Sequence, residues 1–255
     1  GGMVMKSHAG VHPAKLHAGL LNRAEAVGAV VRGRCAVRAI ERTDDGFEVD
    51  TAAGGVRARK VLLATNGYTG KLSPWHRRRV IPIGSYILAT EQLHPALVDE
   101  LLPRDRMMSD TRRMVVYYRA SPDRRRILFG GRSAIFDDDP LASLPRLKAM
   151  MCEIFPQLEN VAVTHNWTGK VAFTFDTLPH IGARDGLHYC IGYCGSGISL
   201  STYFGMRAGH QILGKPEGAT ALDGLAFPSR PYYGGTPWFI GGAIMAYRLL
   251  DRLGW

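Results

Sequence analysis

Cysteines are few, and their arrangement does not indicate a cross-linked or metal-bound protein. The 255 residues include Cys35, Cys152, Cys190 and Cys194, and no two of these form a CxxC pair. Disulfide frameworks and zinc sites both need characteristic cysteine spacings, so the sequence favours neither. We predict reduced thiols and no bound metal.

Long apolar runs are also missing. The longest one near the end of the chain, residues 237–247, is too short and too rich in glycine to cross a bilayer, and no signal segment opens the chain. With 46% hydrophobic and 21% charged residues, the composition is that of a soluble globular protein with a substantial core. We therefore expect a cytoplasmic protein with no membrane partner.

Acidic residues are outnumbered, which gives a formal net charge of +10, but runs of three basic residues occur only at 77–79 and 124–126. We interpret both runs as solvated loop faces, because nucleic-acid-binding surfaces interleave basic with aromatic residues along a helix or sheet. No nucleic-acid partner is expected. The sequence leaves the oligomeric state open.

The first part of the chain has the pattern of an α/β unit. Apolar residues follow Pro13 at helical spacing as far as Gly28, which predicts an amphipathic helix packed on a sheet. Residues 29–40 then predict a strand, and residues 47–58 a hairpin. Residues 60–67 are typical of a buried parallel strand whose end opens into a ligand crevice.

From residue 79 the pattern changes to that of an antiparallel sheet and later returns to α/β. Strand-like runs occupy residues 80–91, 114–119, 127–131 and 161–174, and a helix over 144–154 is expected to cross them. A short buried strand over 187–191 then leads through a glycine-rich turn into a helix over 198–213.

The glycine-rich turn is the best local indication of a binding site. Gly192, Gly195 and Gly197 precede the helix, and backbone amides at a helix N-terminus attract an anion or an electron-rich oxygen. The turn is not a GxGxxG fingerprint, because Leu200 stands where the third glycine belongs. The alternative is a turn that only lets the helix pack close to a sheet.

Two other segments have both a structural and a functional interpretation. Small and polar residues at 64–67 suit close approach to a cofactor, or an ordinary turn at the end of a strand. Trp167 and Phe173 lie on a strand that bends back toward the glycine turn, although aromatic residues on strands are usually part of the core.

Taken in order, these segments resemble the FAD-dependent oxidoreductases of the D-amino-acid-oxidase superfamily, particularly the γ-glutamylputrescine oxidoreductase branch. The resemblance covers nearly the whole chain. It rests on residues 12–13, 63–68, 81–86, 89–91, 129–132, 167–169, 176–182, 192–197 and 237–239.

The resemblance implies an α/β (α+β) fold. A partial FAD-binding Rossmann-like domain would comprise residues 1–78 and 176–255, with an inserted antiparallel-sheet substrate domain over residues 79–175. The family's GxGxxG loop, which binds the FAD pyrophosphate, is expected to lie in a missing N-terminal segment. For this chain alone we therefore expect weak or no retention of FAD, and the chain can be an inactive fragment.

The resemblance also implies site residues. Val37 would lie beside the adenine and residues 64–67 beside the middle of the cofactor. Pro179, Ile181 and Gly182, together with residues 195–198, would line the flavin ring. The expected cofactor contacts are Val37, Ala64, Thr65, Asn66, Gly67, Pro179, Ile181, Gly182, Gly195, Ser196, Gly197 and Ile198, and the expected substrate pocket is Tyr86, Arg132, Trp167 and Phe173.

Two departures from the family pattern refine this expectation. Some relatives attach the flavin through a cysteine in the strand before the aspartate and proline, but residues 168–175 contain none, so noncovalent FAD is expected. Ser199 stands where sarcosine-type relatives place a lysine for the substrate carboxylate, which favours an amine without a carboxylate on its reactive carbon.

The implied function is oxidation of a small-molecule amine, γ-glutamylputrescine or a related compound of polyamine catabolism. Hydride would pass to the flavin, the imine would hydrolyse to an aldehyde, and oxygen would reoxidise the flavin. Because such chemistry belongs mostly to the cofactor, no catalytic acid or base is assigned. The alternatives are a D-amino-acid, glycine or sarcosine-type dehydrogenase or oxidase and, from another class, a noncatalytic remnant or partner-binding accessory subunit.

Overall fold

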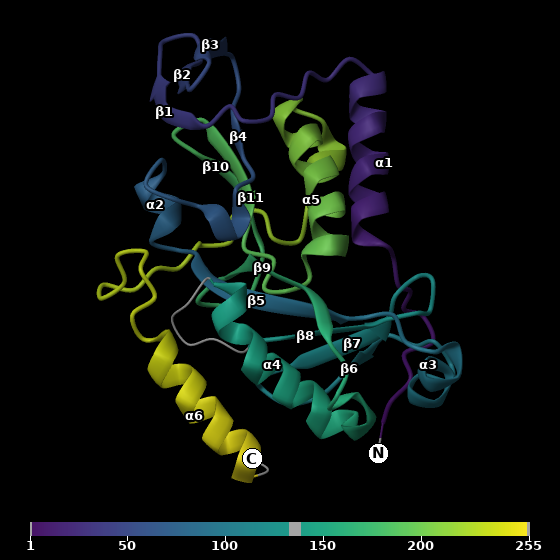
Figure 1. Cartoon of the computed structure of the whole chain (residues 1–255). Coiled ribbons are helices and arrows are strands. Elements are labelled where there is room, and N and C mark those ends of the chain that lie inside the picture. The colour runs from purple at the N-terminus through teal and green to yellow at the C-terminus, as the bar shows by residue number, and fades with distance from the viewer. Residues whose placement is uncertain (1, 133–138, 254–255) are drawn as a thin grey trace.

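The computed structural model describes residues 2–132 and 139–253 of the chain. These residues form a mixed α/β fold in which a five-stranded antiparallel sheet lies below a smaller mixed sheet and its helices (Figure 1). The predicted fold class, α/β with an antiparallel-sheet region, is confirmed. The division of the chain into three segments at residues 78 and 175 stays a prediction.

The five-stranded sheet contains all four strands expected between residues 80 and 174, and every pairing in it is antiparallel. A short strand that the sequence pattern missed adds one edge. In sheet order the strands are β6 (Met108–Ser109), β7 (Val116–Ala120), β8 (Ile127–Gly131), β5 (Ile81–Thr90) and β9 (Val163–Phe173).

One face of this sheet is covered by α4 (Pro140–Ile154), the helix expected to cross it. Strand side chains alternate between the two faces, so Tyr86 and Leu88 of β5 point toward α4 and are almost fully buried. They pack with Leu147 and Met151 of the helix in the largest hydrophobic core. Each fully buried large side chain contributes about 1.5–3 kcal/mol to stability, so this core anchors the sheet.

The smaller sheet joins segments that are far apart in the sequence. Its strands are β10 (His180–Arg184), β11 (Leu187–Ile191) and β4 (Leu62–Leu63), with β10 antiparallel and β4 parallel to β11. The expected parallel strand is therefore present, although only two residues of it pair. The helix after the glycine-rich turn is α5 (Gly197–Ile212), and its Phe204 and Ala208 pack on Ile181 and Cys190 of the sheet.

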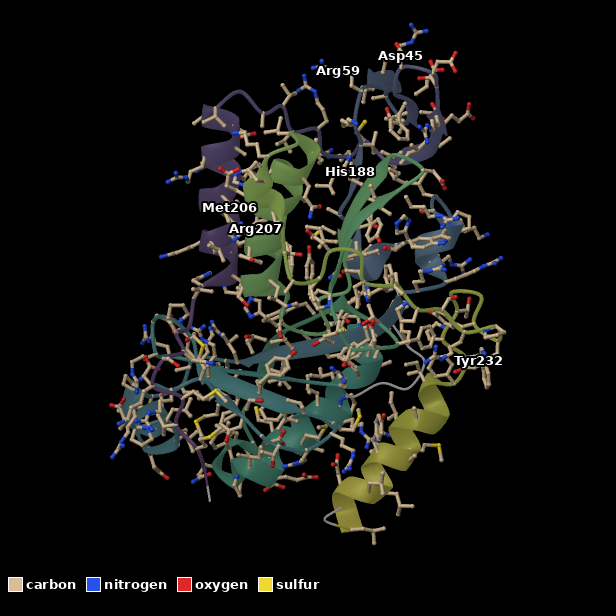
Figure 2. All side chains as sticks on the ribbon, turned by 180° about the vertical axis from the view of Figure 1, so that it is seen from behind. Asp45, Arg59, His188, Met206, Arg207 and Tyr232 are labelled. Carbon is tan, nitrogen blue, oxygen red and sulfur yellow. The ribbon has the colours of Figure 1, made fainter. Side chains whose placement is uncertain are left out.

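The first helix, α1 (Pro13–Ala26), begins at proline and is followed by Gly28 in a left-handed conformation, as predicted. The expectation that it packs on a sheet is wrong. Figures 1 and 2 show α1 beside α5, on which Met206 and Arg207 are labelled, and none of its residues is buried. Amphipathic spacing predicted the helix but not its neighbour.

The strand expected over residues 29–40 is much shorter, since β1 spans only Val37–Arg42. Apolar β-branched residues before it, including Val30 and Val31, are exposed and find no pairing strand. β1 pairs with β2 (Phe47–Thr51), which forms the expected hairpin with β3 (Gly54–Ala58). These strands make a third, separate sheet.

The remaining helices are short or lie near the end of the chain, and the sequence pattern did not single them out. Asp251 of the last helix accepts hydrogen bonds from the backbone amides of Arg113 and Met114, which fastens that helix near the start of β7. These elements are η1 (Asn66–Tyr68), α2 (Pro74–Arg77), α3 (Pro95–Leu101), η2 (Pro156–Leu158), η3 (Pro216–Gly218) and α6 (Ile240–Leu253).

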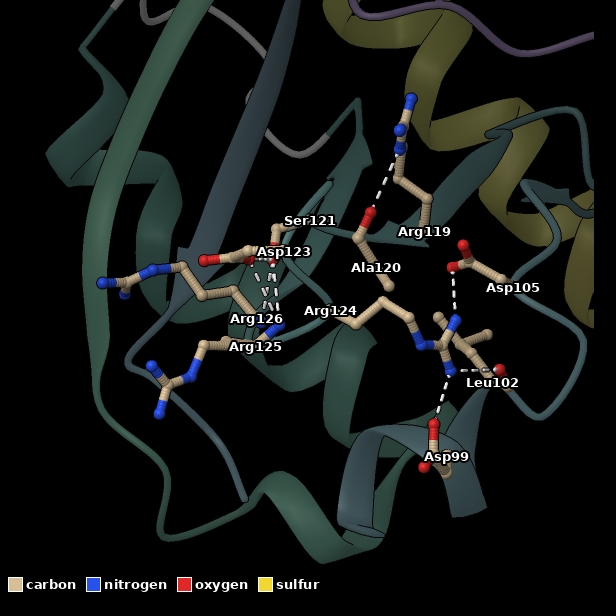
Figure 3. A network of polar contacts seen from close by, with 10 residues as sticks. All are labelled: Asp99, Leu102, Asp105, Arg119, Ala120, Ser121, Asp123, Arg124, Arg125 and Arg126. Atoms are coloured by element: carbon tan, nitrogen blue, oxygen red, sulfur yellow. Dashed lines mark hydrogen bonds and ion pairs between the residues drawn. The ribbon is translucent and has the colours of Figure 1, made fainter. Parts of the chain in front are cut away.

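The basic run at 124–126 is not simply a solvated face, which corrects the sequence interpretation. Arg124 pairs with Asp99 and Asp105, each at 2.7 Å, and so ties the turn between β7 and β8 to α3 and the loop after it (Figure 3). Arg126 donates a 2.6 Å hydrogen bond to the Thr90 carbonyl. Two of the three arginines therefore hold loops in place.

Within the described ranges, no helix is long and apolar enough to cross a membrane.

A buried histidine makes the stability of the fold depend on pH. His76 is 1% exposed, its Nδ1 lies 2.6 Å from Ser73 Oγ, and burial together with nearby Arg79 and Arg184 lowers its pKa to about 4. In the unfolded chain His76 takes up a proton near pH 6.5, whereas in the folded protein it does so only near pH 4. The stability that neutral His76 contributes is therefore fully present above pH 6.5 and is lost as the pH falls toward 4.

We predict that the free energy of unfolding drops by at most about 3 kcal/mol across this window, as measured by urea unfolding at several pH values. His76→Leu should flatten the profile between pH 6.5 and 4. The matched change His17→Leu, on the exposed surface of α1, should leave it unchanged. An equally steep profile in His76→Leu would assign the acid sensitivity to other groups.

Candidate functional site

The candidate site begins where the turns after β4 and β11 meet. These strands are parallel neighbours, so their carboxyl ends lie at the same edge of the sheet. Asn66, in the turn after β4, accepts a 3.0 Å hydrogen bond from the amide of Gly192, in the turn after β11. Asn66 has a left-handed backbone with φ 43°, which asparagine tolerates better than most residues.

The turn after β4 is also fastened to the five-stranded sheet. Gly67 is buried, and a Cβ there would lie 2.5 Å from the carbonyl oxygen of Lys170 on β9. The next residue, Tyr68, accepts a 3.2 Å hydrogen bond from the Lys170 amide through its hydroxyl. Thr65 and Thr69 share a 2.8 Å hydrogen bond that closes the turn.

The glycine-rich turn after β11 needs its glycines for two reasons. Gly192 and Gly195 have φ values of +87° and +102°, and a Cβ at Gly192 would lie 2.5 Å from Thr174 Cγ2. Cys194 donates its amide to the carbonyl of Ala172 at 2.9 Å. The turn is thus held against the end of β9, which brings the two sheets together.

This arrangement leaves the start of α5 accessible. The N-cap residue Ser196 is exposed and makes no side-chain capping hydrogen bond, and a Cβ at Gly195 would meet no atom within 4 Å. The first amides of a helix have no partner within the helix and carry a partial positive charge. The start of α5 therefore fits an electron-rich group of a cofactor, as the sequence suggested.

The loop before β10 is stabilised by Asp176. Its carboxylate accepts a 3.2 Å hydrogen bond from the Leu178 amide and lies 3.1 Å from His180 Nε2. Burial alone would raise the pKa of this carboxyl, but hydrogen bonds from His180, Leu178 and Thr174 lower it overall. The contact between Asp176 and His180 thus spans the loop that contains Pro179.

Arg132 and Phe173, two of the four expected pocket residues, lie together beside the glycine turn. The guanidinium of Arg132 is 4.6 Å from the centre of the Phe173 ring. Burial lowers its pKa, while Tyr117 and Cys194 act in the opposite direction. Tyr117 in turn forms a 2.6 Å hydrogen bond with Ser85.

The other two expected pocket residues lie on opposite faces of the sheet. Trp167 is 42% exposed on the face away from α4, the same face as its partner Ile87 on β5. Tyr86 is 2% exposed and belongs to the core under α4. Alternation along β5 separates Tyr86 from the other three, so the structure gives it a packing role.

The expected cofactor residues are only partly brought together. Residues 64–67, 179–182 and 195–198 surround the joined turns, whereas Val37 is 40% exposed on β1, in a separate sheet that Figure 1 shows at the end of the molecule away from the five-stranded sheet. Ala64 and Ile198 are exposed, and Ile181 is buried under α5.

Sequence reasoning gave no site role to Ser85, Tyr117 or Tyr68, although Ser85 and Tyr68 lie in segments that carry the family resemblance. Tyr117 and Ser85 come from strands that are distant in sequence, and no motif marks Tyr117. The alternation of β5 and β7, combined with the sheet register, is the information that would have found them.

Two turns at the carboxyl ends of neighbouring parallel strands, one of them leading into a helix without a side-chain cap, place the chain in the class of α/β proteins, whose ligands bind in the crevice at that edge of the sheet. Among the described residues, no group of three histidine, cysteine, aspartate or glutamate side chains could hold a metal ion.

Comparison with known proteins narrows this class to one family. Residues 1–210 match the DAO family, described as FAD dependent oxidoreductases. The chain is 35% identical to a probable oxidoreductase, OrdL, of Rhizobium meliloti, over 95% of this chain and 56% of that protein. It is 31% identical to the γ-glutamylputrescine oxidoreductase of Escherichia coli, over 100% of this chain and 60% of that protein. The chain belongs to the family of FAD-dependent oxidoreductases.

Solved structures agree on the fold. Glycine oxidase from Geobacillus kaustophilus superposes with a TM-score of 0.66 at 21% identity, over 84% of this chain and 57% of that chain. L-Proline dehydrogenase from P. horikoshii gives a TM-score of 0.65 at 18% identity, over 83% and 57%. These structures confirm the fold, and the family match over residues 1–210 confirms the resemblance to this superfamily and FAD as the cofactor of the family. The chain spans 56% and 60% of the lengths of the two curated relatives.

The bond between Asn66 and Gly192 yields a prediction about stability. Asn66→Ala loses the acceptor and leaves a residue with a Cβ in the left-handed region, so the free energy of unfolding should fall by about 1–3 kcal/mol. Asn66→Asp keeps both the acceptor and the tolerance of positive φ and should remain close to the unmodified protein. Urea unfolding compares the three, and equal stabilities would show that this bond does not hold the turns together.

Proposed function

We propose that this chain supplies the flavin-ring and substrate side of an FAD-dependent enzyme that oxidises an amine. The observation that carries the proposal is the joining of the two turns by Asn66 and Gly192, beside both the accessible start of α5 and the Arg132–Phe173 pair. γ-Glutamylputrescine, named for the relative from Escherichia coli, is the first amine to test.

Three groups of residues would hold FAD. Residues 64–67 would contact its middle, residues 179–182 one edge of the flavin ring, and the amides of residues 196–198 its electron-rich carbonyl side. The fit rests on the exposed amides of α5 and on the open space above Gly195, which leave room for a planar group. Val37 would lie toward the adenine, and noncovalent attachment remains our expectation.

Bound FAD would supply the oxidation, by accepting a hydride from the carbon next to the amine nitrogen. The chain's own contribution is electrostatic and steric. The positive end of α5 would stabilise negative charge that develops near it, and the half-buried cation of Arg132 would do so from the sheet side. The five-stranded sheet would shield the reacting carbon from water and orient the amine.

A second candidate function is a D-amino-acid, glycine or sarcosine-type dehydrogenase or oxidase. One observation favours it: Arg132 places a guanidinium beside Phe173 and the glycine turn, where it could pair with a substrate carboxylate. The two candidates differ in whether the substrate must carry a carboxylate on the reactive carbon.

The two are separated by anaerobic mixing of the protein, saturated with added FAD because the chain alone is expected to retain it weakly, with γ-glutamylputrescine, glycine and sarcosine in parallel, following loss of flavin absorbance. We expect γ-glutamylputrescine to reduce the flavin. Reduction by glycine or sarcosine alone would select the second candidate. Flavin that is bound but reduced by none of them would favour the noncatalytic alternative.

A single charge at the start of α5 tests the placement of the flavin. Gly197→Asp adds a carboxylate where a Cβ would make only ordinary contacts with Tyr193, and an acidic residue suits the first helical turn. The free energy of unfolding should change little or rise. Flavin affinity should fall about tenfold, because two negative groups would then share one helix terminus.

The matched control is Gly205→Asp, since Gly205 lies on the same helix and a Cβ there meets no atom within 4 Å. This variant should keep its flavin affinity, measured by quenching of flavin fluorescence. Equal affinities of the two variants for FAD would place the flavin elsewhere.

A further inference from the structure

Two hydroxyl groups meet on the face of the five-stranded sheet away from α4, which we call the open face. Tyr117 of β7 and Ser85 of β5 share a 2.6 Å hydrogen bond between their side chains, although β8 lies between these two strands. A Cβ at Gly130 of β8 would overlap the Tyr117 ring, so the missing side chain lets the ring cross that strand. The glycine therefore allows the tyrosine hydroxyl to reach β5.

The strand register brings Arg132 to the same place. Tyr86 of β5 pairs with Gly131 of β8, so the same antiparallel register continued by one residue sets Ser85 opposite Arg132. Cross-strand partners share a face of the sheet, and their Cβ atoms lie about 4.5–5.5 Å apart. Tyr117, Ser85 and Arg132 thus form one group on the open face, which we call the polar row.

The polar row adjoins the candidate site. Ser85 pairs with Gly169 on β9, and a Cβ at Gly169 would lie 3.6 Å from the hydroxyl of Tyr68. Tyr68 directly follows Gly67 in the turn after β4, which is one of the two joined turns. Figure 1 shows α5 and α4 on opposite sides of the five-stranded sheet, so the open face is the one that faces α5. The row therefore lies on the side of the sheet where we place the flavin.

The guanidinium of Arg132 also belongs to the open face. It lies 4.6 Å from the centre of the Phe173 ring, and Phe173 lies an even number of residues along β9 from Trp167, which points away from α4. Arg132 also borders a pocket that contains Glu153 and Asp251. However, α4 and α6, which carry these two carboxylates, lie on the other side of the sheet (Figure 1).

The polar row offers hydrogen-bond donors and positive charge. The positions that neighbour Ser85 on the open face carry no acidic residue; they are Ile83, Ile87, Gly130, Gly169 and Val171. Two hydroxyls that share one hydrogen bond keep one hydrogen to donate, and a guanidinium has five. A second ammonium here would meet a cation and no carboxylate, whereas an acyl oxygen would accept hydrogen bonds from both groups.

A ligand can reach the polar row, because all three of its residues are half-buried rather than enclosed in the core. The Tyr117 ring also forms part of the wall of an apolar cavity of about 740 Å³ on the open face, together with Ile87, Leu128 and Trp167. This size is usual for small-molecule sites, which span about 300–1,000 Å³. The row is therefore a polar group at the edge of an accessible apolar surface.

We propose that the polar row binds an acyl oxygen, of an amide or a carboxylate, on the non-reacting part of the substrate amine. The enzyme then selects amines that carry such a group over free diamines. The inference rests on the proposed function for the meaning of substrate, but the binding preference itself requires no flavin. γ-Glutamylputrescine, which has both an amide and a carboxylate, belongs to this class. Tyr117 and Ser85 become the residues that select the substrate.

The test compares three compounds with a four-carbon spacer after the reacting amine: N-acetyl-1,4-diaminobutane, 5-aminopentanoate and 1,4-diaminobutane. Titration calorimetry gives their affinities for the 255-residue protein, and loss of flavin absorbance gives their rates of reduction when the protein is saturated with added FAD. We expect at least one of the two acyl compounds to bind about tenfold more tightly than the diamine, since a hydrogen bond to a charged donor has that effect. Equal affinities, or tighter binding of the diamine, would overturn the proposal.

Two variants show whether the row is responsible. Tyr117→Phe removes the hydroxyl and keeps the ring, and Ser85→Ala removes its partner. Each should weaken binding of the preferred acyl compound by about tenfold and leave binding of 1,4-diaminobutane unchanged. The matched control is Tyr118→Phe, because Tyr118 is the next residue of β7, points to the opposite face and stacks on Phe129. A preference that survives in both row variants, or that is lost equally in the control, would contradict the assignment.

Failure of this inference can be distinguished from failure of the proposed function. Reduction of the flavin by 1,4-diaminobutane at least as fast as by either acyl compound would overturn the role of the polar row and leave amine oxidation standing. Selective binding of an acyl compound that is lost in Tyr117→Phe, with no reduction of bound flavin by any amine, would support the row and remove the function.

Discussion

The hydrogen bond from the Gly192 amide to the Asn66 side chain is the contact on which the candidate site depends. It joins the turns after two parallel strands that are more than a hundred residues apart in sequence. Both turns also contact β9, through Gly67 on Lys170 and Cys194 on Ala172. One edge of the small sheet, the start of α5 and the end of the antiparallel sheet are therefore held in a single arrangement.

The second constraint is the alternation of side chains in the five-stranded sheet. The same strand, β5, contributes Tyr86 and Leu88 to the core under α4 and Ser85 and Ile87 to the opposite face. Because α4 covers only one face, the other face is open and carries an apolar cavity lined by Ile87, Leu128 and Trp167. The alternation thus places the packing residues and the open surface on opposite faces of one sheet.

Local sequence signals predicted those elements whose determinants lie within a few neighbouring residues. Proline and glycine marked the ends of α1, alternating apolar residues marked β5 and β9, and the glycine-rich turn marked the start of α5. These local signals failed where contacts with distant segments decide the structure. Residues 29–36 have strand-forming composition but no partner strand, and α1 has helical spacing but lies beside α5 rather than on a sheet.

The candidate site divides in the same way. The sequence by itself determined the turns, because left-handed glycines and small residues after buried strands are local requirements, and the ordered motifs determined the family. Only the tertiary structure decided that Arg132 and Phe173 meet at the glycine turn while Tyr86 faces the core. It also decided that Tyr117, Ile87 and Trp167 share one face, because strand register and the position of α4 arise from contacts between distant segments.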